Sequence, residues 1–203
     1  MSKLKSKIIG NQVWTVENLT REQYKKITRI NIPIINDIWD NDQPKCCTYE
    51  SLIQTSKKKN YLFDKNAISY FSRYRNTNNW RIPTIKDLEI LSNFIDANTS
   101  TDWETDNLAI ALRGTYGWLN NGTNKIGFNA LPNPTKNETG ALTGFEIAKW
   151  WVYNETSRIY DGFSLYNDID VVTLCGTNDK IGLAVRLVMD LQSPRIEDDI
   201  EYV

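Results

Sequence analysis

The twelve residues from Trp80 to Leu91 read WRIPTIKDLEIL and contain the start of the clearest helix in the chain. Pro83 stands just before Thr84, a residue suited to cap a helix, and Asp87 follows three positions later in the spacing of a capping box. Apolar residues then recur at helical intervals: Leu88, Leu91, Phe94 and Ile95. We therefore expect an amphipathic helix that begins after Thr84 and packs this face against a core.

Toward the N-terminus, the segment Lys7–Val16 reads KIIGNQVWTV. Its two β-rich runs flank Gly10-Asn11, a dipeptide that tolerates the positive φ angles of a tight turn, so we expect a β-hairpin. Residues 20–60 are mixed and polar. Within them we expect one strand, at residues 30–35, at a sheet edge because the run contains a proline.

Helical spacing recurs in Asn66–Arg75 and in Asn107–Arg113, and after these segments the pattern changes. The strands expected beyond them are Ala148–Tyr153, Arg158–Tyr166, Val171–Leu174 and Ile181–Met189. Helices early and strands late predict an α+β fold, with two main helices packed on a twisted mixed or antiparallel sheet. Gly114–Gly144 is rich in Asn, Gly and Thr and predicts a long loop region suited to recognition.

Composition excludes several classes of function. The 203 residues include no histidine, which removes imidazole as a base, a proton shuttle or a metal ligand. A net charge of -1 argues against nucleic acid as a partner, and we expect the basic run Lys57–Lys59 to be a solvated loop. No tract is long and apolar enough to predict membrane insertion.

Three cysteines, Cys46, Cys47 and Cys175, make a poor disulfide framework, because the count is odd and two of them are adjacent. The N-terminal MSKLKSKIIG lacks the apolar stretch of a signal peptide. We therefore expect reduced thiols and folding in a reducing cytosol.

Four segments stand in a distinctive order: IGNQVWTVENL at Ile9–Leu19, WRIPTIKDLEIL at Trp80–Leu91, IGFNALPNP at Ile126–Pro134 with KWW at Lys149–Trp151, and AVRLVMD at Ala184–Asp190. In this order they resemble the Fibrobacter succinogenes major paralogous domain family. The resemblance covers about residues 9–190 of a single domain spanning 1–203, with 20–60 divergent or inserted and 191–203 an acidic tail. It implies a C-type-lectin-like fold with a first strand, a main helix, a loop region and a closing strand.

Family members are often exported from Bacteroidetes-type cells and often carry one Cys before the Trp-Arg motif and another in the closing strand. Here these positions hold residues of Asn76–Asn79 and Leu187. The loss of both thiols agrees with a chain that is not built for an oxidising compartment.

The resemblance also reaches, more distantly, to formylglycine-generating enzymes, whose oxidation chemistry uses a cysteine pair and a metal. Cys175 has no sequence partner, and the adjacent pair Cys46-Cys47 lies in the unmatched stretch. Three acids, Asp102, Glu104 and Asp106, are better explained as helix-capping acids than as glycosidase carboxylates. We therefore expect no enzyme and no catalytic residue.

Calcium is the metal that many C-type lectins use to hold sugar. Asp168 and Asp170 offer only two oxygen ligands, where Ca²⁺ takes about 6 to 8. We expect neither a metal site nor another cofactor.

The chain is rich in aromatic residues, with seven Trp, ten Tyr and six Phe. Trp14, Trp80, Trp150 and Trp151 fall inside the family motifs and are expected in the core, with the adjacent pair on opposite sides of a strand. Aromatic and Asn residues that alternate in and beside loops resemble an antibody-like binding surface. The candidate binding residues are Trp118, Asn120, Asn121, Asn124, Tyr153, Asn154, Tyr160 and Tyr166.

From these features we expect a non-catalytic binding or structural module. The expected setting is a phage virion, as a head or tail fibre or decoration subunit assembled in the host cytoplasm, with other virion proteins or further copies of the chain as partners. A cell-surface glycan or protein is a further expected partner. The alternatives are an exported bacterial surface domain that binds carbohydrate or protein and, behind it, a formylglycine-type enzyme.

Overall fold

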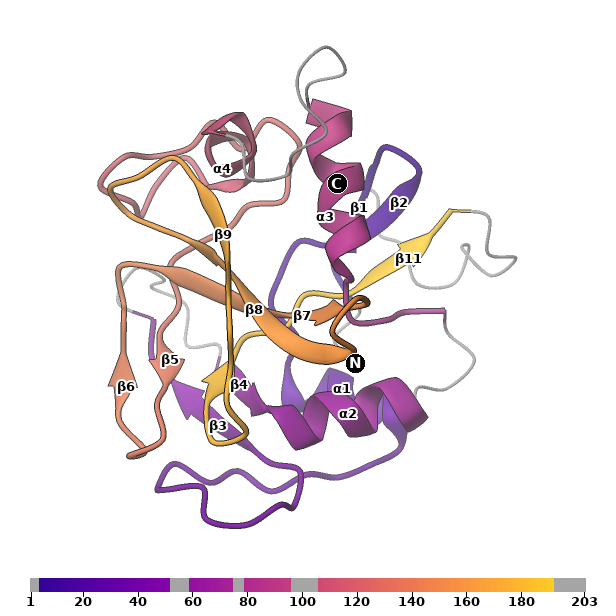
Figure 1. Cartoon of the computed structure of the whole chain (residues 1–203), viewed down its shortest axis with the longest axis vertical. Helices are drawn as coiled ribbons and strands as arrows, with labels where there is room; N and C mark the ends of the chain where they lie inside the picture. The colour runs from indigo at the N-terminus through magenta and orange to yellow at the C-terminus, as the bar shows by residue number, and fades with distance from the viewer. Residues whose placement is uncertain (1–3, 52–58, 75–78, 96–105, 192–203) are drawn as a thin grey trace.

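The computed structural model describes residues 4–51, 59–74, 79–95 and 106–191. Within these residues the chain forms three antiparallel sheets and four helices, so the expected α+β class is confirmed. Strand content exceeds helix content. In Figure 1 the β7–β8–β9 sheet crosses the middle of the molecule, α1 and α2 lie together on one side of it, and α3 and α4 lie on the other.

The first sheet brings the two ends of the described chain together, in the order β1-β2-β11. Its strands are β1 (Ser6–Ile9), β2 (Gln12–Thr15) and β11 (Val188–Asp190). The expected N-terminal hairpin is confirmed: Gly10 adopts a φ of 62° in the turn, a conformation that glycine takes without steric cost. Val188 pairs with Trp14, so the closing strand completes the hairpin.

The second sheet has five strands, in the order β3-β4-β10-β5-β6. They are β3 (Cys46–Tyr49), β4 (Asn60–Asp64), β10 (Gly182–Leu183), β5 (Thr135–Lys136) and β6 (Leu142–Thr143). The expected continuous strand Ile181–Met189 is wrong, because β10 and β11 belong to different sheets. Between them, Arg186 is 3% exposed and donates hydrogen bonds to the carbonyls of Thr15 and Phe128, which breaks the strand pattern.

The third sheet is the antiparallel meander β7 (Ala148–Asn154), β8 (Ile159–Leu165) and β9 (Val172–Cys175). The sequence predicted all three strands to within two residues at each end. The turn between β7 and β8 is held by the side chain of Asn154, whose Oδ1 accepts hydrogen bonds from the amides of Thr156 and Ser157.

Two helices pack against each other beside the second sheet, α1 (Arg21–Thr28) and α2 (Lys65–Tyr74). The second was predicted. The first was not, although Thr20 and Gln23 form a full capping box at its start. Tyr24 of α1 is fully buried and donates its hydroxyl to the carbonyl of Ala67.

Helices α3 (Ile85–Ile95) and α4 (Asp106–Leu112) were both predicted. The expected capping box of α3 is confirmed, because Thr84 Oγ1 accepts the Asp87 amide at 3.3 Å and Asp87 Oδ2 accepts the Thr84 amide at 2.7 Å. Leu88 and Leu91 are buried as expected. Phe94 is 52% exposed, which corrects the predicted face: its ring lies against the hairpin turn at Gly10, while Ile95 packs against the core as expected.

Two hydrophobic clusters form the core, and β3 and β7 each contribute to both. Trp150 belongs to one cluster and Trp151 to the other, as expected for neighbours on a strand. Cys47 and Cys46 divide in the same way. Trp14 and Trp80 are also almost fully buried, so all four motif tryptophans pack inside the protein.

Residues 20–60 contribute to this core where the structure describes them, through α1, β3 and Trp39. The strand expected at residues 30–35 is wrong, because the segment makes only an isolated bridge between Ile34 and Cys46. Residues 30–35 instead run from the end of α1 toward β3 without a continuous backbone pairing.

Some predictions lie outside the described residues: the acidic tail from residue 192 onward, the capping acids Asp102 and Glu104, and most of the basic run at residues 57–59. The Asp106 side chain is also outside them. Among the helices that the structure describes, none combines the length and apolar character needed to cross a membrane.

Candidate functional site: a tyrosine-lined pocket

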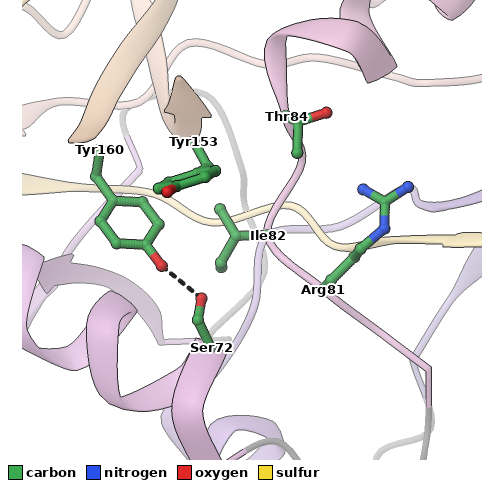
Figure 2. A pocket seen from close by; sticks show the side chains of 6 residues that line it. All are labelled: Ser72, Arg81, Ile82, Thr84, Tyr153 and Tyr160. Atoms are coloured by element: carbon green, nitrogen blue, oxygen red, sulfur yellow. Dashed lines mark hydrogen bonds between the residues drawn. The ribbon is translucent and has the colours of Figure 1, made fainter. Parts of the chain in front are cut away.

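The β7–β8 hairpin, α2 and the segment before α3 line an open pocket of about 360 Å³. Figure 2 shows the six side chains that line it: Ser72, Arg81, Ile82, Thr84, Tyr153 and Tyr160. Two of them, Tyr153 and Tyr160, belong to the binding residues that the sequence predicted. The residues around these two tyrosines therefore determine which ligands the pocket can accept.

Strand register places the two tyrosines side by side. Tyr153 on β7 pairs directly with Tyr160 on β8, and residues opposite each other in an antiparallel pair project from the same face. Their ring centroids are 5.1 Å apart and the rings are inclined at 56°. In Figure 2 they form one continuous aromatic wall of the pocket.

The two hydroxyl groups of this wall differ in their hydrogen bonding. The Tyr160 hydroxyl bonds to Ser72 Oγ of α2 at 2.6 Å, which fixes the ring between the sheet and the helix. The Tyr153 hydroxyl makes no hydrogen bond to residues that the structure describes. The Tyr153 hydroxyl is therefore available to a ligand both as a donor and as an acceptor.

The opposite side of the pocket is the extended segment between Trp80 and α3. Backbone pairing fixes this segment, because Arg81 bridges to Val188 and the Tyr153 amide donates to the Pro83 carbonyl at 2.8 Å. Ile82 lies beside the tyrosine rings, whereas the Thr84 hydroxyl points away from them and bonds Asp87. In Figure 2 Ile82 stands between the rings and Arg81, whose guanidinium projects away from them.

Arg81 is already paired with carboxylates. Its guanidinium bonds both oxygens of Asp87, one of them at 2.8 Å, and reaches Asp190 of β11 at 3.2 Å. Burial alone would raise the pKa of Asp87, but its hydrogen bonds and ion pair with Arg81 outweigh burial and hold that pKa below its usual value. The arginine thus acts mainly as a structural clamp with a partly exposed edge.

The same clamp reaches the first sheet. Gln12 Nε2 donates to Asp87 Oδ1, and Trp14 Nε1 donates to Gln12 Oε1 at 3.1 Å. Since Asp87 is 2% exposed, this network of buried polar groups ties α3 to the N-terminal hairpin. The wall of the pocket therefore rests on a rigid support.

Trp118 does not lie on a surface. Its side chain is 5% exposed, belongs to a core cluster and donates Nε1–H to the Ala130 carbonyl at 2.9 Å. The expectation that Trp118 is an exposed loop residue is wrong. The buried ring holds the long loop against the core, because burying a large aromatic side chain stabilises the fold more than exposing it.

The three predicted loop asparagines use their side chains within the loop. Asn121 Oδ1 accepts the Trp118 amide at 3.1 Å, and Asn120 Nδ2 donates to the Asp168 carbonyl at 3.4 Å. Asn124 has a φ of 47° and accepts the Asn129 amide at 2.7 Å. These amides hold the loop in shape.

The remaining predicted residues lie at opposite ends of the hairpin. Tyr166 follows β8, and its hydroxyl accepts a hydrogen bond from Thr173 at 3.1 Å. Tyr160 lies six residues earlier, or about 20 Å along an extended strand. Asn154 lies at the Tyr160 end and bonds Asp161. The eight predicted residues therefore form two groups, and the structure brings only Tyr153 and Tyr160 into the pocket.

Sequence reasoning missed four lining residues: Ser72, Arg81, Ile82 and Thr84. Arg81, Ile82 and Thr84 belong to the WRIPT motif, so the motif was recognised but its second role as a pocket wall was not. Ser72 carried no signal, because only the packing of α2 against β8 places it there.

The thiols lie apart from the pocket. Burial raises the pKa of Cys46 to about 12 and that of Cys47 to about 11, so neither is a ready thiolate. The two thiols face different core clusters, and Cys175 bonds the Gly162 carbonyl within the third sheet. Asp170 pairs with Arg113. Within the described chain no three acidic, Cys or His side chains gather as metal ligands.

Comparison with known proteins gives one result. The family model described as the Fibrobacter succinogenes major domain matches residues 8–189. The curated proteins and the solved structures yield no match. The matched range runs from the first hairpin to β11 and thus includes every lining residue of the pocket.

Proposed function

Because the chain belongs to the Fibrobacter succinogenes major domain family, we infer that it is a non-catalytic binding module that presents a shaped surface for attachment. The observation that carries this proposal is the pocket between Tyr153 and Arg81. Its aromatic wall is open to a ligand, and its one cation is bonded to Asp87 and Asp190. Such a site suits recognition more than bond cleavage.

The finer fold that we propose is C-type-lectin-like. The pairing of the N-terminal hairpin, through β2, with the last described strand β11 and the loop region of residues 114–134 before β5 support this assignment. On this fold the module displays loops and one pocket from a scaffold of helices and sheet.

The setting that we propose is a phage virion, as a fibre or decoration subunit that is assembled in the host cytoplasm together with other virion proteins or copies of itself. The state of the cysteines supports assembly in a reducing compartment, since Cys46, Cys47 and Cys175 are all free. A cell-surface glycan or protein would then be the target of attachment.

Two measurements test the proposal. Mass spectrometry of purified phage particles from the source culture should detect the chain in fixed proportion to the capsid proteins. The purified protein should also adsorb to intact host cells. Recovery of the chain in the outer-surface fraction of uninfected cells would instead favour an exported bacterial binding domain.

Thiol titration addresses the enzyme alternative. We expect the three thiols to react only slowly in the folded protein, and copper to cause no coupled oxidation of two of them. A copper-dependent redox pair that supports turnover would contradict the non-catalytic proposal.

A further inference from the structure

The size of the tyrosine pocket limits its ligand. Its volume of about 360 Å³ is at the lower end of the range for small-molecule sites, roughly 300 to 1,000 Å³. The space suits one small ring.

The charges around the pocket disfavour a charged ligand. Arg81 is the only lining residue that carries a charge, and its guanidinium already bonds Asp87 and Asp190. An anion would have to compete with these two carboxylates, and a cation would lie near an arginine. Either would lose hydration without gaining a free partner of opposite charge.

The remaining chemistry of the pocket is both aromatic and rich in hydroxyl groups. Four of the six lining residues carry a hydroxyl: Ser72, Thr84, Tyr153 and Tyr160. The Tyr153 hydroxyl makes no hydrogen bond to the described residues, whereas Ser72 and Tyr160 bond to each other and Thr84 bonds to Asp87. A wholly apolar ligand would leave the Tyr153 hydroxyl unpaired, which costs binding free energy.

We propose that this pocket binds a single neutral pyranose ring of a glycan, without a metal ion. The C–H face of the sugar packs on the inclined rings of Tyr153 and Tyr160, and a sugar hydroxyl bonds the Tyr153 hydroxyl. Ile82 supports the edge of the ring. This inference rests on the proposed function, since it names the class of target that the binding module recognises.

The test is a titration of the full-length protein with neutral methyl glycosides of common hexoses and N-acetylhexosamines, followed by saturation-transfer NMR. Glucuronate and choline serve as an anionic and a cationic comparison. We expect signal from at least one neutral glycoside, weaker signal from both charged compounds, and no change after addition of EDTA.

Three variants locate the binding. Tyr153→Phe keeps the ring and loses the hydroxyl, so we expect affinity to fall about fivefold. Tyr153→Ala should lower it more than about tenfold by removing the stacking surface. Tyr116→Ala is the matched control, because Tyr116 is 49% exposed and does not line the pocket. Thermal melts check that each variant is folded.

Four results would overturn the inference: no binding by any neutral glycoside, stronger binding of choline or glucuronate, full binding by folded Tyr153→Ala, or loss of binding with EDTA. The adsorption experiment separates the two proposals. If the protein adsorbs to host cells while one of these four results holds, the glycan pocket alone is wrong. If it neither adsorbs nor binds a glycoside, the proposed function is wrong as well.

Discussion

Near one end of the β7–β8 hairpin, Trp118 and Asn124 make contacts within the protein: Trp118 is buried in the core, and Asn124 accepts a hydrogen bond within its own loop. At the other end, Tyr153 and Tyr160 present their rings to a pocket. Both ends combine aromatic residues with asparagine near loops, and the sequence pattern does not separate them. The difference between the ends is which polar groups keep no partner after folding, and we expect binding only where such groups remain.

The largest expected effect on stability comes from Trp118, at the end of the hairpin without the pocket. Trp118→Ala removes a fully packed indole and its hydrogen bond to Ala130, and should lower the free energy of unfolding by roughly 3 to 5 kcal/mol. Urea unfolding measures this loss. The folded fraction should still bind a ligand at the tyrosine pocket normally. An unchanged unfolding midpoint together with lost ligand binding would show that Trp118 serves binding rather than stability.

A second variant tests the buried network around Asp87 that supports the pocket wall. Asp87→Asn weakens the buried pair with Arg81 and should cost about 2 kcal/mol at neutral pH. The pKa of Asp87 is lower in the folded state than in the unfolded chain, so its charge stabilises the protein above about pH 4 and this stabilisation is lost as pH falls further. The difference in free energy of unfolding between wild type and variant should therefore narrow on acidification. A difference that widens would show that the pKa of Asp87 is not lowered by folding.

The third variant measures the loop brace. Asn124→Ala leaves a residue with a Cβ but no side-chain amide at a φ of 47° and loses the bond to the Asn129 amide. We therefore expect the free energy of unfolding to fall by about 1 to 2 kcal/mol. Asn124→Gly is the control: it tolerates the positive φ and should recover about half of the loss. Equal stability of all three proteins would show that the loop does not depend on this side chain.

The smallest expected effect concerns the cap of α3. Thr84→Ala loses the side-chain acceptor for the Asp87 amide and should cost about 1 kcal/mol in thermal unfolding. Thr84→Ser retains the hydroxyl and should remain close to wild type. Because Thr84 also lines the pocket, ligand binding by the two variants tests whether the methyl group contributes to the wall.

Local signals predicted much of the fold. The hairpin turn at Gly10, the capping box of Thr84 and Asp87, and the alternating strands β7 and β8 depend on neighbours within a few residues. Their types and positions therefore follow from spacing. The core position of Trp150 and Trp151 on opposite faces follows from the strand period in the same way.

The missed elements depend on distant partners. Strand β3 is stabilised by pairing with β4. The residues of β10 were predicted as part of one strand with β11, whereas β10 pairs with β4 and β5 in another sheet. The short helix α1 had a usable local signal in Thr20 and Gln23, but its polar composition obscured it. In the pocket, Ser72 comes from a helix far away in sequence from Tyr160, so no spacing rule could have joined them.

The pairing of Trp14 with Val188 has a consequence for synthesis. The β1–β2 hairpin is synthesised long before β11, the strand that completes its sheet. Pairing across such a sequence separation slows folding, because the intervening loop must close before the contact is gained. The nascent chain therefore exposes an incomplete sheet edge until β11 has been made, and stop codons placed before residue 188 should yield aggregation-prone products.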